Sequence, residues 1–61
     1  MGLLFIDEVS GLTRVAPGSL RNMRLASRGP NSFKVGPRVV YKREDVLAWI
    51  EAQYTANGKV A

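Results

Sequence analysis

Cysteine and histidine are both absent from the 61 residues of this sequence. Many small domains are held together by disulfides, or by a zinc ion bound through thiolates and imidazoles, and neither kind of support is open to this chain. A domain of about 60 residues removes only about 60% of its unfolded surface from water, so a small apolar core must stabilise the fold alone. We expect one domain over residues 1–61, with its core at about residues 3–54, a tail at residues 55–61, no metal and no cofactor.

The apolar segments are too short to cross a membrane. Residues 3–6 and 46–50 fall far below the roughly 20 residues that a membrane-spanning helix needs, and no basic segment precedes the first as it would in a signal peptide. The composition, with 46% apolar and 23% charged residues, is typical of a folded soluble domain. We therefore expect a cytoplasmic protein that makes no contact with a membrane.

The spacing of apolar residues predicts a first helix at about residues 6–13. Ile6, Val9 and Leu12 recur at helical intervals. Asp7 and Glu8 fall where the N-terminus of a helix favours negative charge. The next three residues form a short link to a second helix.

Pro17 suits the first turn of that second helix, because its missing N–H has no partner there. Gly29 can adopt the left-handed conformation that ends a helix, and Pro30 cannot continue one, so we expect the end near Ser27 or Arg28. Two short helices joined in this way form a helix-turn-helix unit. The inward face of the second helix should carry Leu20 and Met23, with Leu25 at its edge.

Two β-prone segments, residues 32–35 and 39–41, flank Gly36, Pro37 and Arg38 and predict a hairpin. A three-residue loop would pair Val35 with Val39 and Phe33 with Tyr41.

That register gathers four apolar side chains on one face, whereas a two-residue loop would set Val35 opposite Arg38. We therefore expect the three-residue loop. The positions that face outward or lie at the tip are then Lys34, Arg38 and Val40.

Glu44 and Asp45 mark the beginning of a third helix, which should close the core. Asn57 and Gly58 should mark its end. Its buried stripe is expected to consist of Val46, Leu47, Ile50 and Tyr54, with Trp49 at the edge.

The basic residues are concentrated in one part of the chain. Eight of the nine Lys and Arg residues lie from Arg14 to Arg43, and all five acidic residues lie outside this stretch. A surface with this charge fits a polyanion, and nucleic acid is the commonest one.

On the second helix Arg21, Arg24 and Arg28 recur at i, i+3 and i+7, which predicts one cationic stripe without an acidic partner. Arg can bind guanine and Asn can bind adenine through two hydrogen bonds in the major groove. The candidate DNA-binding residues of this helix are Pro17, Gly18, Ser19, Arg21, Asn22, Arg24 and Arg28. Those of the hairpin and its flanks are Lys34, Gly36, Arg38, Lys42, Arg43 and Arg14.

Each pattern has a second interpretation. A stripe of Arg can be merely the solvated face of an amphipathic helix, although the neighbouring cations and the absence of acids disfavour this. Arg38 could enter a minor groove or contact phosphates alone. Gly18 could admit a phosphate close to the backbone or only weaken the helix. Phe33 and Tyr41 fit the core better than they fit stacking on bases.

Catalysis is not expected. No His or Cys is present, and the serines have no base nearby in the sequence pattern that could activate them. We therefore predict that the chain is not an enzyme and has no catalytic residue.

Three segments form a pattern typical of one family: FIDEVSGL, VAPGSLRNMR and FKVGPRVVYKREDVLAWI. The most specific part is the hairpin followed by Tyr41-Lys42-Arg43-Glu44-Asp45. Over residues 3–54 the chain resembles the excisionase-type, MerR-like winged-helix DNA-binding domains.

The resemblance implies a mainly α fold with a small β-hairpin, a winged helix-turn-helix built of a helix, a recognition helix, a two-stranded wing and a closing helix. It also implies that the second helix enters the major groove, with Ser19, Arg21, Asn22 and Arg24 as readers. Lys34 and Arg38 of the wing would contact the adjacent minor groove or backbone.

In function, the resemblance implies an architectural protein of a bacteriophage that binds repeated sites in double-stranded DNA, bends the DNA and directs an integrase to excision. Copies are expected to associate cooperatively on DNA in the cytoplasm of the bacterial host. MerR-type activators carry a dimerisation helix and an effector domain, for which the sequence has no counterpart. The alternatives are a small phage or prophage transcriptional regulator and the DNA-binding module of a terminase small subunit, which would need an oligomerisation region. RNA binding is less favoured, since no aromatic stacking platform is evident.

Overall fold

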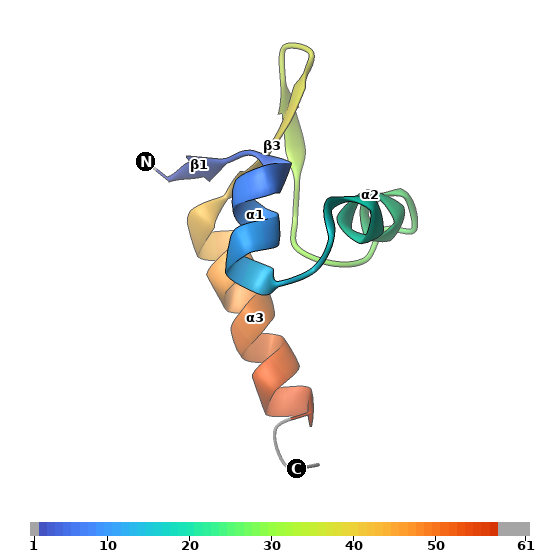
Figure 1. Cartoon of the computed structure of the whole chain (residues 1–61). Coiled ribbons are helices and arrows are strands. Elements are labelled where there is room, and N and C mark those ends of the chain that lie inside the picture. The colour runs from blue at the N-terminus through green and yellow to red at the C-terminus, as the bar shows by residue number, and fades with distance from the viewer. Residues whose placement is uncertain (1, 58–61) are drawn as a thin grey trace.

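The computed structural model describes residues 2–57, which form three helices and a three-stranded antiparallel sheet (Figure 1). The sheet has the strand order β1-β3-β2, so its central strand is the last in the sequence. The expected succession of helix, helix, hairpin and helix is confirmed, and a first short strand is added to it. In chain order the elements are β1 (Leu3–Leu4), α1 (Ile6–Thr13), α2 (Pro17–Leu25), β2 (Phe33–Val35), β3 (Arg38–Lys42) and α3 (Arg43–Asn57).

Helix α1 has the bounds that the sequence predicts. Its first turn carries two acidic residues, and the Glu8 carboxylate accepts a hydrogen bond from the Phe5 N–H at 2.9 Å. At the other end the Thr13 hydroxyl donates to the Val9 carbonyl at 2.8 Å, and Arg14 ends the helix in a left-handed conformation with φ 63°. The Glu8 side chain therefore satisfies an N–H that the helix itself leaves without a partner, and the Thr13 hydroxyl adds a second bond to a carbonyl in the last turns.

Helix α2 ends at Leu25, two to three residues before the expected position. The N–H of Ser27 donates to the carbonyl of Arg24 at 3.1 Å, and the N–H of Arg28 donates to that of Met23 at 2.7 Å. This pair of bonds is the Schellman motif, which needs a left-handed residue, and Ser27 supplies it with φ 57°. The prediction that Gly29 ends the helix was therefore wrong.

Gly29 has a different role. Its φ is 78°, and a Cβ atom there would lie 3.1 Å from the end of the Met23 side chain. Together with the buried Pro30, it turns the chain from α2 back towards the sheet.

The register of the hairpin differs from the expected one. Val35 lies opposite Arg38 and Phe33 lies opposite Val40, so the loop contains only Gly36 and Pro37. Gly36 has φ 62°, and a positive φ followed by the fixed φ of proline is the arrangement of a type II′ turn, which matches the twist of a hairpin. The chemistry of the turn thus decides the register.

Residues directly opposite each other share a face of the sheet, so the register divides the apolar side chains between two faces. Tyr41 and Val39 lie on the inner face with Leu4, which pairs with Tyr41. Phe33 and Val35 lie on the outer face, 44% and 52% exposed. The expectation that Phe33 belongs to the core was wrong, whereas the burial of Tyr41 is confirmed. Val40, expected to face outward, does so but is nearly fully buried among its neighbours.

The core is small and joins every layer of the molecule. Val9 of α1, Leu20 of α2, Tyr41 of β3 and Val46 of α3 are all at most 1% exposed and pack together. Half-buried residues surround this cluster: Leu4, Ile6, Val15, Met23, Val39 and Ile50.

Helix α3 extends beyond this core (Figure 1). Val46 is buried and Ile50 is half-buried, but Leu47 is exposed and Tyr54 is 71% exposed, so the predicted buried stripe was wrong at these two positions. The helix continues through residues 55–57, which were expected in the tail, while Gly58 lies outside the described residues. Within residues 2–57 no helix combines the length and the apolar character that crossing a membrane requires.

The Tyr41 hydroxyl is buried and has no hydrogen-bond partner among the described residues. A buried polar group without a partner costs about 1–3 kcal/mol, so Tyr41→Phe should raise the free energy of unfolding, by about 1 kcal/mol. Urea denaturation measures the change. Tyr54→Phe is the control, because its hydroxyl is exposed, and it should leave stability unaltered. A loss of stability in Tyr41→Phe would contradict the environment described here.

Candidate nucleic-acid interface

The cations between Arg14 and Arg43 are almost all free of ion pairs. One salt bridge forms among residues 2–57, between Lys42 Nζ and Glu44 Oε1 at 3.5 Å, and both side chains are exposed. Exposed pairs of this kind contribute little to stability. The other seven basic side chains of the stretch have no carboxylate within salt-bridge distance in this part of the chain, so their charge remains available to an external anion.

The fold brings cations of α2 and of the hairpin to one hollow. Arg21 and Arg24 line it from α2, and Arg38 lines it from the start of β3. The hollow has a volume of about 250 Å³ and opens to solvent. Asp7, at the start of α1, is the one acidic residue of its lining. The remaining lining residues are Phe5, Ile6, Pro37 and Val39.

Arg38 does not lie at the tip of the hairpin, where the sequence had placed it. It is the first residue of β3, and its guanidinium carbon lies 4.2 Å from the centre of the Phe5 ring. A cation over an aromatic face is attracted by the ring. Phe5, which the sequence analysis did not single out, thus positions Arg38; only the register of the sheet reveals this contact.

The beginning of α2 is open. Pro17 occupies the first turn, and Gly18 and Ser19 are exposed. A Cβ atom at Gly18 would meet no atom within 4 Å, so packing within the domain does not require a glycine at this position.

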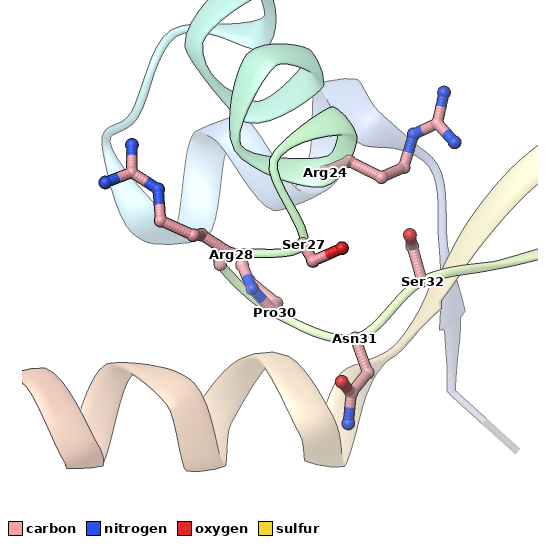
Figure 2. Close-up of a pocket in the computed structure, with 7 residues that line it drawn as sticks. Arg24, Ser27, Arg28, Pro30, Asn31 and Ser32 are labelled. Carbon is pink, nitrogen blue, oxygen red and sulfur yellow. The ribbon is translucent and has the colours of Figure 1, made fainter.

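The outward face of α2 also differs from the expected stripe. Arg21 and Asn22 are exposed on it and Arg24 is half-buried, but Arg28 lies beyond the end of the helix. Figure 2 shows the side chains of Arg24 and Arg28 pointing away from each other on two sides of the turn. The predicted continuous stripe therefore holds for Arg21 and Arg24 alone, because the left-handed residue redirects the chain before Arg28.

Leu25, expected at the edge of the inward face, is instead 75% exposed. Helical geometry places it about 40° from Arg21 around the helix. An apolar side chain in this position could contact a thymine methyl group. The hydrophobic pattern alone could not distinguish Leu25 from an inward-facing residue, because the pattern does not show that the helix ends at this position.

A second hollow, of about 230 Å³, lies beside the turn that follows α2 (Figure 2). Arg24 and Ser27 line one side of it, and Asn31 and Ser32 line the other. The sequence pattern indicated no binding role for the hydroxyls of Ser27 and Ser32, and it is the turn that brings them to one hollow with Arg24. Arg28, Gly29 and Pro30 complete the lining.

The other candidates of the hairpin and its flanks line neither of these two hollows. Lys34 is exposed and shares the inner face of the sheet with Val39, its partner in the register. Lys42 pairs with Glu44, and the Arg43 N–H donates to the Gly2 carbonyl at 2.6 Å. The structure therefore brings Arg21, Arg24 and Arg38 together around one hollow, which Lys42 and Arg43 do not line. Two remaining candidates lie in connections, Gly36 in the hairpin turn and Arg14 in the link between α1 and α2.

Comparison of the chain with family models, curated proteins and solved structures finds no match.

The contact between Phe5 and Arg38 should be measurable as a coupling free energy. In a double-mutant cycle with Phe5→Leu and Arg38→Gln, we expect about 0.5–1 kcal/mol of coupling in the free energy of unfolding. A cycle of Phe5→Leu with Arg21→Gln serves as the control and should be additive, because Arg21 lines the same hollow without a contact of this type to the ring. Additivity in both cycles would show that the ring does not hold Arg38.

Proposed function

We propose that this protein binds double-stranded DNA as a winged helix-turn-helix domain. In this arrangement α2 is the recognition helix in the major groove, and the β2–β3 hairpin is the wing against the adjacent backbone or minor groove. The β1 strand extends the sheet of the wing on its other side.

One observation carries the proposal. Arg21 and Arg24 of α2 and Arg38 of the hairpin line the same hollow, although Arg38 lies 14 positions after Arg24 in the sequence. None of the three makes an ion pair within residues 2–57. A helix and a hairpin whose unpaired cations face the same hollow suit a DNA duplex, with the helix in the groove and the hairpin against the flanking phosphates.

The residues of α2 divide by chemistry. Arg21 and Asn22 are exposed and suit the edges of guanine and adenine. Gly18 and Ser19 lie at the N-terminus of the helix, where free N–H groups favour a phosphate, and the missing side chain of Gly18 allows close approach. Lys34 and Arg38 would contact the backbone from the hairpin.

The biological role that we propose is that of an excisionase-type architectural protein, which binds repeated sites, bends DNA and directs a phage integrase to excision. Its support is the resemblance in the hairpin and the start of the last helix. The proposed protein partners are an integrase and further copies of the chain on neighbouring sites. A nuclease footprint tests this role: adjacent repeats beside a recombination site would support it, and a single palindrome over a promoter would favour a transcriptional regulator.

The electrostatic part of the proposal predicts a steep dependence on salt. If the surface neutralises about six phosphates, the logarithm of the association constant should fall with the logarithm of the salt concentration at a slope near −5. Fluorescence anisotropy with a labelled duplex at several salt concentrations gives this slope. A flat response would contradict binding through these cations.

The division between readers and backbone contacts predicts different effects for two variants. Arg21→Ala should cost about 1–3 kcal/mol at the preferred site and little on random duplex, because it removes a contact to a base. Lys34→Ala should weaken binding to the preferred site and to random duplex equally. It should also reduce the magnitude of the slope of log affinity against log salt by about 1.

The preferred site is first selected from a library of random duplexes, and both variants are then titrated on selected and random DNA. Gln53→Ala, on the exposed end of α3, is the control for a substitution away from the interface. Equal losses on both duplexes for Arg21→Ala would reject its role as a reader.

A further inference from the structure

Ser27 has an unfavourable conformation for its residue type. It is the left-handed residue of the turn after α2, with φ 57°, in the place where helices usually have glycine. A side chain is strained there, because its Cβ atom crowds the backbone. Residues held in such conformations are found preferentially at functional sites, so the hydroxyl of Ser27 calls for an explanation.

The internal contacts of the domain do not supply one. Within residues 2–57, the side-chain hydrogen bonds involve Glu8, Thr13 and Asn57, and none involves Ser27. The N–H of Ser27 closes the turn, but glycine would provide the same N–H. The fold therefore uses the backbone of this residue and leaves its hydroxyl free.

The hydroxyl faces the hollow beside the turn. In Figure 2 the side chains of Ser27 and Ser32 both lie on the side of the turn towards which Arg24 extends, whereas Arg28 points to the opposite side. All of these residues line the hollow. Two hydroxyl donors and one guanidinium, with no acidic residue in the lining, form a set that suits an anion with several oxygen atoms.

We propose that this notch, formed by Arg24, Ser27 and Ser32, binds one backbone phosphate of the DNA. The proposal rests on the proposed function, because it identifies the anion as a phosphodiester of the duplex that α2 enters. The Ser27 and Ser32 hydroxyls donate to the phosphate oxygens, and Arg24 supplies the positive charge.

This assignment gives Arg24 a different role from Arg21. Arg24 is half-buried and lines both hollows, while Arg21 is exposed and lines only the one between α2 and the hairpin. A phosphate held at the C-terminal end of α2 would fix how deeply the helix enters the groove, and Arg21 would then meet the bases in a defined register. Arg24 is therefore a positioning residue, and the notch sets the register.

Ser27→Gly tests the proposal, since stability and affinity should change in opposite directions. Glycine relieves the backbone strain, so the melting temperature should rise by roughly 4 °C. The loss of the hydroxyl should weaken binding to the duplex about tenfold, because hydrogen bonds to charged groups are strong. Ser27→Ala keeps a side chain at this φ and should lose affinity without the gain in stability. Ser10→Ala, on α1, is the control and should leave affinity unchanged.

A second experiment locates the phosphate. Each phosphate of the preferred duplex is replaced in turn by an uncharged methylphosphonate, and affinity is measured for the wild type and for Ser27→Gly. At one position the methylphosphonate should lower the affinity of the wild type about tenfold. The affinity of Ser27→Gly, already reduced on the unmodified duplex, should fall little further at this position. Ser32→Ala should likewise respond less than the wild type to the methylphosphonate at that same position.

The outcomes separate this proposal from the proposed function. Failure of the wild type to bind duplex DNA would overturn both. Normal binding with equal losses for both proteins at every methylphosphonate would overturn the notch and leave the DNA-binding function in place. NMR shifts of notch amides with inorganic phosphate, combined with no coupling to any position of the duplex, would assign the notch to free phosphate and reject the DNA contact.

Discussion

The two-residue turn at Gly36 and Pro37 is the constraint on which the rest of the structure depends. It fixes the register of β2 against β3, and a shift by one residue would exchange the two faces of the strands. Because Val35 meets Arg38, Tyr41 turns inward to the core and Arg38 turns outward to the Phe5 ring. The position of Arg38 is therefore a consequence of the backbone conformation of one glycine, and the hairpin could not present Arg38 in this way with the longer loop.

The basic stretch imposes a second constraint, because cations without acidic partners repel one another and contribute nothing to a small core. The fold leaves most of them exposed, and Arg24 is half-buried. The turns that follow α1 and α2 have left-handed residues that are not glycine, Arg14 and Ser27. Both keep a polar side chain where glycine would be less strained. Stability is thus lower than the same backbone with glycine at these two positions would allow.

The features that the sequence predicted well are local. The bounds of α1 follow from acidic residues and apolar spacing, and the start of α2 follows from Pro17. The features that it missed depend on contacts between distant residues. The two residues of β1 form a strand only because β3 is beside them, and periodicity counted Leu47 and Tyr54 as core because it does not reveal where α3 extends past its neighbours. In the hairpin, apolar pairing and turn chemistry favoured different registers, and turn chemistry prevailed.

The same distinction applies to the candidate site. Counting charges identified Arg21, Arg24 and Arg28 as equivalent members of a stripe, whereas their surroundings differ. Arg21 is exposed on the helix, Arg24 lies between two hollows, and Arg28 follows a turn that directs it to another side. A guanidinium reads a base only if something else holds the helix in register, and a phosphate contact can do this without reading sequence. The surroundings of these three residues are therefore set by the turn that ends α2, and in the proposed phosphate contact the hydroxyl of Ser27 at that turn acts together with the charge of Arg24.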